Sequence, residues 1–402
     1  LRLVRNRNYS LLWIGQLVSL LGERIHQVAL GFLVLRATQS PVDVGLTFAA
    51  TAVPNILLGP LAGALVDRWD RRLTMIACDV VRAGLVLAVP FAIQINIAFV
   101  YLAAFLIATV TLLFRPAKTA IIPDIVGERD LVPANSASSF ADGVADLVGL
   151  PLAGVIVASL GSLELAFAMN TGTYLVSAIA IIGMSTPRTA SAESPFSPGA
   201  IWSEMVEGWN FLRHQAELFS NTAFSTVAQL AVGAEIVVTF SYAEDVIQRG
   251  PTSAEETYAF ILAAIAAGSI VGGIGFGAIG ERIPKGIAVI AGFIGMGLAL
   301  AAAGLTDRLW VAMLLFFVVG LSNMLFIIPT ITLFQQRTPG RLLGRVVSSR
   351  QALVFGAIAA SMAISGILAD VMGPSAVLVL FGAICAGAGA VALLVPPMRN
   401  AR

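Results

Sequence analysis

The stretch GPLAGALVDRWDRR at residues 59–72 recurs later in the chain as GIGFGAIGERIPKG at residues 273–286. Both copies fit the pattern G-x3-G-x3-[DE]-R-x2-[RK], and each follows a long apolar run. The acidic positions are 281 − 67 = 214 residues apart, and the same offset nearly superposes Pro116 on Pro329. The agreement predicts a parallel repeat of two similar halves, an architecture from which transporters build a central site. The motif positions are Gly59, Gly63, Asp67, Arg68 and Arg71, then Gly273, Gly277, Glu281, Arg282 and Lys285.

The composition is that of a membrane protein. The 402 residues are 58% hydrophobic and 12% charged, with a mean hydropathy of +0.90. Because one bilayer span takes roughly 20 apolar residues, twelve spans account for most of the chain and leave little for a soluble domain. The net charge of +1 argues against nucleic acid as a partner. The only cysteines, Cys78 and Cys385, lie in apolar runs, which predicts neither a disulfide framework nor a metal cluster.

We expect an all-α membrane protein of twelve transmembrane helices in two pseudo-symmetric six-helix bundles. Apolar runs interrupted by Pro, Gly or charged residues define the spans. In the first half they are near 9–35, 42–66, 73–95, 98–122, 133–159 and 162–184. In the second half they are near 217–247, 257–280, 286–304, 309–335, 346–369 and 374–396.

The expected domains are an N-terminal bundle at 1–184, a cytoplasmic linker at 185–215 and a C-terminal bundle at 216–402. The linker starts with Pro, Ser and Thr, and it ends in residues that predict an interfacial amphipathic helix. A plain disordered tether is the alternative for this segment. The apolar positions at helical spacing are Trp202, Met205, Trp209 and Leu212.

The positive charges give an independent test of the topology, because Lys and Arg collect on the cytoplasmic side of membrane spans. Arg36, Arg249 and Arg308 fall on the outer side and Arg24 falls mid-helix, so 24 − 3 − 1 = 20 basic residues lie in the cytoplasmic segments or the cytoplasmic halves of helices. This asymmetry predicts a multi-pass protein of the plasma (inner) membrane with both termini in the cytoplasm.

Four segments carry a resemblance to a known family. The segment GALVDRWDRR at 63–72 resembles the loop signature between the second and third helices of the major facilitator superfamily. Three further segments resemble the branch of that superfamily that comprises drug/proton antiporters and includes macrolide and enterobactin exporters. They are SLLGERIHQVAL at 19–30, FRPAKTAIIPDIV at 114–126 and EGWNFLRH at 207–214. This branch is also similar to lysophospholipid transporters.

The resemblance covers nearly the whole chain. It implies a monomer that works by rocker-switch alternating access between its two bundles. Gly149, Pro151 and Gly154 resemble a degenerate form of the Gly-Pro antiporter motif of helix 5. The chain departs from the branch at Glu23, where Asp is frequent, and at Leu150, which separates the Gly-Pro pair.

Helix 1 carries a polar stripe that falls within a narrow sector of the helix. A carboxylate within a span faces protein or water, so we expect Glu23 to line a substrate or proton site. A structural hydrogen-bonding stripe between helices is the alternative. The stripe comprises Gln16, Ser19, Glu23, His26 and Gln27.

Helix 5 repeats this arrangement and brings two more acids, Asp142 and Asp146, into the membrane on one face with Asn135 and Ser138. Carboxylates that share such a site can bind and release protons near neutral pH. The alternative is that Arg115 or Arg82 neutralises them permanently; Arg115 is itself a candidate site residue.

Helix 7 contributes Glu235, two residues from the position that the 214-residue offset assigns to Glu23. Gly233 precedes it by two residues, and Gly22 precedes Glu23 by one. The two acids can attract a cationic amphiphile, or one can carry a coupling proton while the other contacts substrate.

By resemblance, Gly63 and Asp67 with Arg68, Arg71 and Arg72 form a cytoplasmic gate, closed by ion pairs to Asp124 and to the N-terminus of helix 11. Glu281 and Arg282 are the corresponding positions in the second copy. The alternative is that these arginines only satisfy the topology. The five glycines of helix 8 predict close helix packing rather than phosphate binding. They are Gly268, Gly272, Gly273, Gly275 and Gly277.

The leading hypothesis is a secondary active transporter that exports small lipophilic or amphiphilic compounds by proton antiport. A lysophospholipid or lipid flippase without obligatory proton coupling is the alternative. A non-transporting receptor or scaffold is a further one, and a channel is disfavoured because the repeat suits rocking better than a fixed pore. No Gly-Lys-Ser/Thr follows a glycine loop, so energy is expected from the proton gradient, with no cofactor. An enzyme is disfavoured because the only histidines are His26 and His214 and the chain lacks HExxH and GxSxG. The expected partners are an amphiphilic substrate and membrane lipids.

Overall fold

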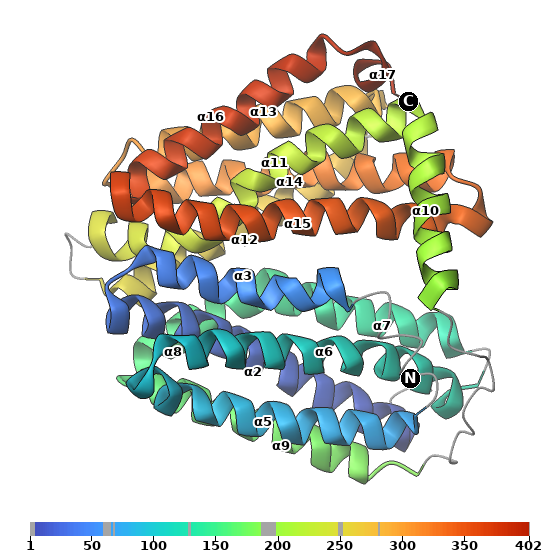
Figure 1. The fold of residues 1–402 in the computed structure, drawn as a ribbon, viewed down its shortest axis with the longest axis vertical. Coiled ribbons are helices and arrows are strands. Elements are labelled where there is room, and N and C mark those ends of the chain that lie inside the picture. The colour runs from blue at the N-terminus through green and yellow to red at the C-terminus, as the bar shows by residue number, and fades with distance from the viewer. Residues whose placement is uncertain are drawn as a thin grey trace. The chain divides into compact units, whose positions relative to one another are not determined.

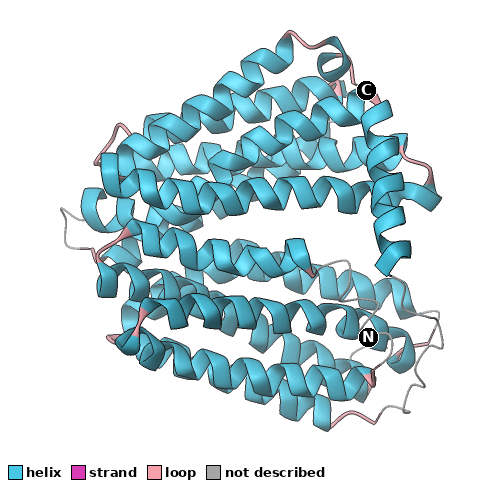
Figure 2. Cartoon of the chain, viewed as in Figure 1, coloured by secondary structure: helices cyan, strands magenta, loops and turns pink. Residues whose placement is uncertain are grey.

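The computed structural model describes residues 5–58, 66, 69–127, 130–185, 198–247, 252–279 and 282–401. Within these ranges the regular structure is helical and there is no strand (Figure 2). The predicted all-α class is confirmed.

The helices of the first half follow one another along the chain in the order of their labels (Figure 1). They are α2 (Arg7–Thr38), α3 (Pro41–Leu57), α5 (Arg71–Ile95), α6 (Ile97–Ile125), α7 (Leu131–Val144), the π-helical turn η2 (Ala145–Gly149), α8 (Leu150–Leu160) and α9 (Leu163–Ile182).

The second half begins with the linker helix and ends in a short helix at the C-terminus. Its elements are α10 (Pro198–His214), α11 (Ala216–Ser241), the π-helical turn η3 (Tyr242–Ile247), α12 (Ala254–Ile279), α13 (Lys285–Ala303), α14 (Leu309–Arg337), α15 (Gly340–Met372), α16 (Pro374–Leu393) and α17 (Pro396–Arg399).

Eleven helical segments in the described ranges are long and apolar enough to cross a membrane. They coincide with eleven of the twelve predicted spans. The remaining one, predicted near 42–66, begins as α3, whose 17 described residues stop at Leu57. Multiple membrane spans are therefore confirmed, while the count of twelve stays a prediction.

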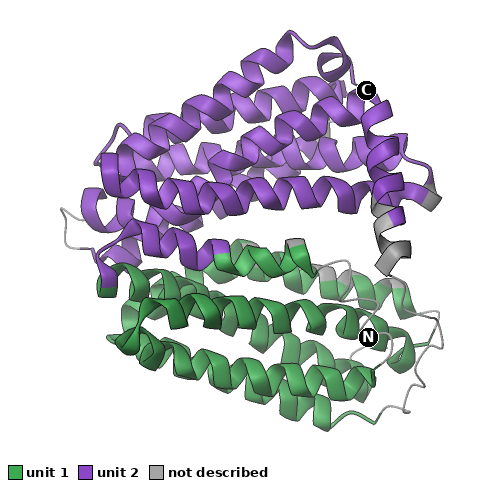
Figure 3. Cartoon of the chain, viewed as in Figure 1, with its two compact units in different colours: residues 1–37, 50–198 green, residues 38–49, 199–402 purple. Residues whose placement is uncertain are grey.

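The chain divides into two compact units (Figure 3). Unit 1 comprises residues 1–37 and 50–198, and unit 2 comprises residues 38–49 and 199–402. The first half of α3 belongs to unit 2, where Phe48 stacks on Phe240 with ring centroids 5.6 Å apart. The linker helix α10 also belongs to unit 2. The predicted domain limits at 184 and 216 stay a prediction.

Each unit packs its own apolar core. In unit 1, α5 packs against α6 and α9 (Figure 1). Met75 and Phe114 are among the buried side chains of this core. In unit 2, α13 packs against α14 and α16, and the rings of Phe293 and Phe326 lie 5.0 Å apart. Side-chain caps set where α5 and α6 begin: Asp70 accepts a hydrogen bond from the backbone of Leu73, and Asn96 does the same for α6.

The helix predicted in the linker forms as α10. Leu212 is fully buried in a cluster with residues of α11, α14 and α15, and Glu207 forms an ion pair with Arg345 of α15. A Cβ on Gly208 would lie 2.4 Å from the Arg345 carbonyl oxygen, so the two helices touch through backbone. The earlier linker residues, with Pro187 and Pro195, lie outside the described ranges.

The glycines of α12 fall into two groups. A Cβ on Gly268 would lie 1.9 Å from the Phe317 carbonyl oxygen of α14, and one on Gly272 would lie 2.6 Å from that of Leu321. Added Cβ atoms on Gly273, Gly275 and Gly277 would meet nothing within 4 Å. Close packing therefore accounts for only the first two.

Candidate functional site

A buried arginine lies at the centre of the charged cluster in unit 1. Arg82, on α5, donates from Nη1 to the Glu23 carboxylate of α2 at 2.9 Å and from Nη2 to Asp79, one turn earlier on its own helix. Its side chain is 2% exposed. The guanidinium carbon lies 4.4 Å from the ring centroids of both Phe114 and Tyr174. Two carboxylates and two aromatic faces therefore stabilise this cation away from water.

Glu23 receives a second hydrogen bond, from the Tyr174 hydroxyl at 3.2 Å. Glu23 lies near the middle of the 32-residue α2, sixteen residues after its first and fifteen before its last. Its side chain is 24% exposed, whereas that of Asp79 is fully buried. Glu23 is thus the carboxylate of this cluster that a solute can reach.

A cavity of about 360 Å³ opens beside the cluster. Its volume lies at the lower end of the range for small-molecule sites, roughly 300–1,000 Å³. Most of its lining side chains are polar or charged. They are Gln16, Ser19, Leu20, Glu23, Arg24, Arg82, Thr111, Phe114, Arg115, Lys118, Thr119 and Asp142.

The predicted stripe on α2 divides at this cavity. Gln16, Ser19 and Glu23 line it, and Gln16 also donates to Ser177 of α9 at 3.2 Å. His26 and Gln27 do not line it. His26 packs edge-on against Phe167, with ring centroids 5.2 Å apart, and the Gln27 amide oxygen accepts a hydrogen bond from Arg24 at 3.0 Å.

The fifth predicted span, which forms α7, η2 and α8, brings one of its two acids to the cavity. The Asp142 carboxylate, half exposed, lies 3.3 Å from the Lys118 ammonium of α6. The cation that pairs with Asp142 is therefore Lys118, and not Arg115 or Arg82 of the alternative raised for the acids of this span; Arg82 bonds Glu23 and Asp79 instead. The Asp146 backbone lies in η2, and its side chain is outside the described set.

The degenerate Gly-Pro motif, formed by Gly149, Pro151 and Gly154, coincides with a local change of helix type. The π-helical turn ends at Gly149, and α8 follows with Pro151 in its first turn. Proline has no N–H to donate to the preceding turn, which gives a physical reason for the wider turn before it. A Cβ on Gly149 would lie 3.1 Å from Arg24 Cγ, so this turn passes close to α2, and Gly154 is buried on the following helix.

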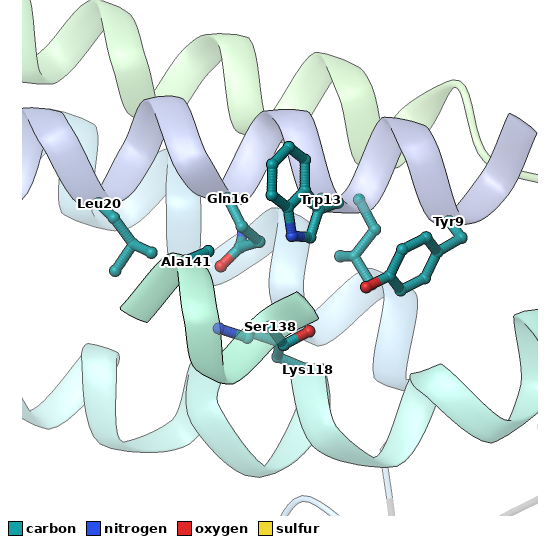
Figure 4. Close-up of a pocket in the computed structure, with 8 residues that line it drawn as sticks. Tyr9, Trp13, Gln16, Leu20, Lys118, Ser138 and Ala141 are labelled. Atoms are coloured by element: carbon teal, nitrogen blue, oxygen red, sulfur yellow. The ribbon is translucent and has the colours of Figure 1, made fainter. Parts of the chain in front are cut away.

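A smaller pocket adjoins the cavity and shares Gln16, Leu20 and Lys118 with it. In Figure 4, side chains of α2 face Ser138 and Ala141 of α7 across this pocket. Its volume of about 10 Å³ holds about one water molecule. This small pocket lies where α2 packs against α7, and it has no room for a solute.

The first copy of the repeated motif ends in two arginines that tie unit 1 together. Arg71 lies 2.8 Å from the Asp124 carboxylate and 3.0 Å from the Ala120 carbonyl oxygen of α6. Arg72 donates to the last carbonyls of α9, at Ile181 and Ile182. A cation is stabilised there by the partial negative charge at the C-terminal end of the helix. The predicted ion pair with Asp124 is present, and Arg71 makes it.

The other gate positions are less informative. Gly63, Asp67, Arg68 and Glu281 lie outside the described ranges, and Arg282 is exposed. The gating role therefore stays a proposal.

The model of a family described as transmembrane secretion effector matches residues 2–401. The chain belongs to that family. The family is part of the major facilitator superfamily of membrane transporters, as the resemblance in the sequence predicted.

Relatives and solved structures agree with this assignment. The transporter is 25% identical to macrolide efflux protein A of Streptococcus pyogenes, over 90% of this chain and 89% of that protein. It is 25% identical to the multidrug efflux pump Tap of Mycolicibacterium fortuitum, over 94% of this chain and 93% of that protein. A mutant of the nucleoside transporter NupG has the same fold, with a TM-score of 0.82 and 10% identity over 96% of this chain and 99% of that chain.

The second unit of this transporter holds the remaining predicted acid. Glu235 lies on α11, and its side chain is half-buried without an ion pair among the described residues. Gly233 lets α11 approach α15 closely, because a Cβ there would lie 2.5 Å from the Ile358 carbonyl oxygen.

Three residues of the transporter's charged cluster were not predicted as site residues: Asp79, Arg82 and Tyr174. The signal for two of them is present in the sequence, because Asp79 and Arg82 stand three residues apart inside an apolar run. Ionisable residues within a span are functional candidates by default. Tyr174 carries no such signal, because a tyrosine side chain is uncharged near neutral pH.

Proposed function

We propose that this transporter exports small lipophilic or amphiphilic compounds across the cell membrane by proton antiport. The observation that carries the proposal is the mid-helix carboxylate Glu23, which bonds a buried arginine and also lines a cavity large enough for a small molecule. The efflux activity named for two of its relatives supports the direction of transport.

The chemistry of the proposed coupling follows from the contacts of Arg82. When Glu23 is ionised, Arg82 bonds two carboxylates and the cavity wall is tied across α2 and α5. When Glu23 takes a proton, its attraction to Arg82 weakens and Asp79 keeps the arginine in place. Proton binding thereby changes the charge at the cavity wall without leaving Arg82 unpaired.

The membrane arrangement belongs to the same proposal. Both termini lie in the cytoplasm, the protein acts as a monomer in the inner membrane, and its two halves rock to give alternating access. The Arg71–Asp124 pair and its neighbours contribute to closing the cytoplasmic side. The basic residues concentrated on one side of the predicted spans support this orientation.

The test is substrate-driven proton movement in proteoliposomes that contain a pH dye. Cationic drugs, macrolides and lysophospholipids are tried against wild type, Glu23→Gln and Glu235→Gln. Glu164→Gln is the matched control, because Glu164 is exposed and contacts Ser162 at the start of α9. We expect Glu23→Gln to abolish proton flux and the control to retain it.

The alternative is a lipid or lysophospholipid flippase without obligatory proton coupling. The observation that favours it is that both carboxylates lining the cavity have cationic partners, and such pairs need no proton to remain stable. Substrate movement without proton flux in wild type, retained in Glu23→Gln, would establish this alternative and refute antiport.

A further inference from the structure

The cavity in unit 1 is lined by more cations than anions. The lining carboxylates are Glu23 and Asp142, and the lining cations are Arg24, Arg82, Arg115 and Lys118, so the formal charge of the lining is 4 − 2 = +2. Asp79 lies behind Arg82, and including it gives 4 − 3 = +1. The described charges therefore favour an anionic solute.

The two lining carboxylates are already engaged. Glu23 lies 2.9 Å from Arg82, and Asp142 lies 3.3 Å from Lys118. A cationic solute would compete with these side chains for the carboxylates. Separating Arg82 from Glu23 would weaken the compensation of a buried cation, which is costly.

Arg115 is the lining cation that an anion can use directly. It is exposed, and it has no ion pair with any described residue. Arg115 and Lys118 are three residues apart on α6, so both cations face the cavity from neighbouring positions of one helix. The guanidinium group offers a planar fork of donors that matches a carboxylate, sulfonate or phosphate.

The same cavity also has apolar surface. Leu20 of α2 and Phe114 of α6 line it, and the Phe114 ring stacks on Arg82 on one face. One ligand can therefore place an anionic head group beside Arg115 and pack its apolar part against Leu20 and Phe114.

We propose that the substrate of this transporter is an anionic amphiphile, whose acidic head binds Arg115 beside Lys118 and whose apolar part contacts Leu20 and Phe114. This inference rests on the proposed function and specifies its substrate class. It replaces the cationic amphiphile that Glu23 of α2 and Glu235 of α11 led us to consider.

The test is direct binding in nanodiscs of zwitterionic phosphatidylcholine, with empty nanodiscs subtracted. The probes are two permanently charged dyes, the anion 8-anilinonaphthalene-1-sulfonate and the cation ethidium. The variants are Arg115→Gln, Arg115→Lys and the control Arg7→Gln, which removes an exposed arginine of the same unit outside the cavity.

We expect wild type to bind the sulfonate more tightly than ethidium. Loss of a charge-assisted hydrogen bond predicts about tenfold weaker sulfonate binding in Arg115→Gln. Arg115→Lys is expected to restore much of this affinity, and Arg7→Gln to leave it unchanged. Tighter binding of ethidium by wild type, or equal effects of Arg115→Gln and Arg7→Gln, would overturn the proposal.

Competition then identifies the kind of anion. Displacement of the sulfonate dye by monoacyl phosphatidate but not by inorganic phosphate supports an amphiphile, and displacement by both overturns the requirement for an apolar part. The outcome is separable from that of the proposed function. Sulfonate binding without proton flux in proteoliposomes refutes antiport alone, whereas proton-coupled movement of ethidium without sulfonate binding refutes the anionic substrate alone.

Discussion

Replacing Arg82 with methionine is expected to be among the most destabilising substitutions in unit 1. Methionine retains most of the apolar volume but removes both ion pairs and both aromatic contacts of the guanidinium. Asp79 is then a fully buried carboxylate without a cation. Removing one partner of a buried ion pair costs about 3–5 kcal/mol, and we expect a loss in that range.

The matched control is Arg71→Met, which removes an arginine that is also paired with one aspartate. The side chains of Arg71 and Asp124 are 25% and 21% exposed, so water can solvate the aspartate that remains. For such a pair we expect a loss of about 1 kcal/mol or less. The difference between the two variants reports the greater burial of Arg82 together with its second carboxylate and its aromatic contacts.

The free energy of unfolding is measured in mixed micelles of rising dodecyl sulfate content, followed by tryptophan fluorescence. A third variant combines Arg82→Met with Glu23→Gln and Asp79→Asn, which removes the uncompensated charges and is expected to regain much of the lost stability. The reasoning is refuted if Arg82→Met costs no more than Arg71→Met, or if the triple variant is no more stable than the single one.

Three further predictions concern helix packing and the cavity wall. Gly268→Ala is expected to destabilise by about 1–3 kcal/mol because its Cβ would meet a carbonyl of α14, while Gly273→Ala on the same helix is not; thermal unfolding of both compares them. A double-mutant cycle of Lys118→Gln and Asp142→Asn, measured as free energies of unfolding in dodecyl sulfate, is expected to give a coupling energy below about 1 kcal/mol, since the aspartate is half exposed. A much larger coupling energy would contradict the weak, solvated ion pair inferred from this exposure. Tyr174→Phe is expected to lower the free energy of unfolding in dodecyl sulfate by about 1 kcal/mol, because the hydrogen bond to the Glu23 carboxylate is lost. An unchanged free energy of unfolding would mean that this bond contributes nothing to stability.

The positions of acids within the spans were predictable from sequence because an apolar run makes each ionisable residue conspicuous. Glu23, Asp142 and Glu235 stand out in this way, and the first two line the cavity. The helices themselves were equally predictable, since the bilayer requires long apolar segments whose backbone groups bond internally.

Which side chains meet was not predictable, because the rotation and crossing of packed helices decide it. Arg82 is 59 residues from Glu23, and Lys118 is 24 residues from Asp142. The sequence offered Arg115 and Arg82 as partners for Asp142 and Asp146. The packing of α6 against α7 brings Lys118 to Asp142 instead. The same packing separates the glycines of α12 into two that touch α14 and three that meet nothing.

By itself, the sequence determined an all-helical membrane protein with an internal repeat, because repeat and apolar length are properties of the chain alone, and its motifs carried the resemblance to a transporter superfamily. The tertiary structure decided that Arg82 bonds both Glu23 and Asp79, and that Arg115 lines the cavity without an ion pair to any described residue. The physical reason is that a charge inside a membrane protein must find its partner on another helix or in the adjacent turn, and the geometry of helix packing selects that partner.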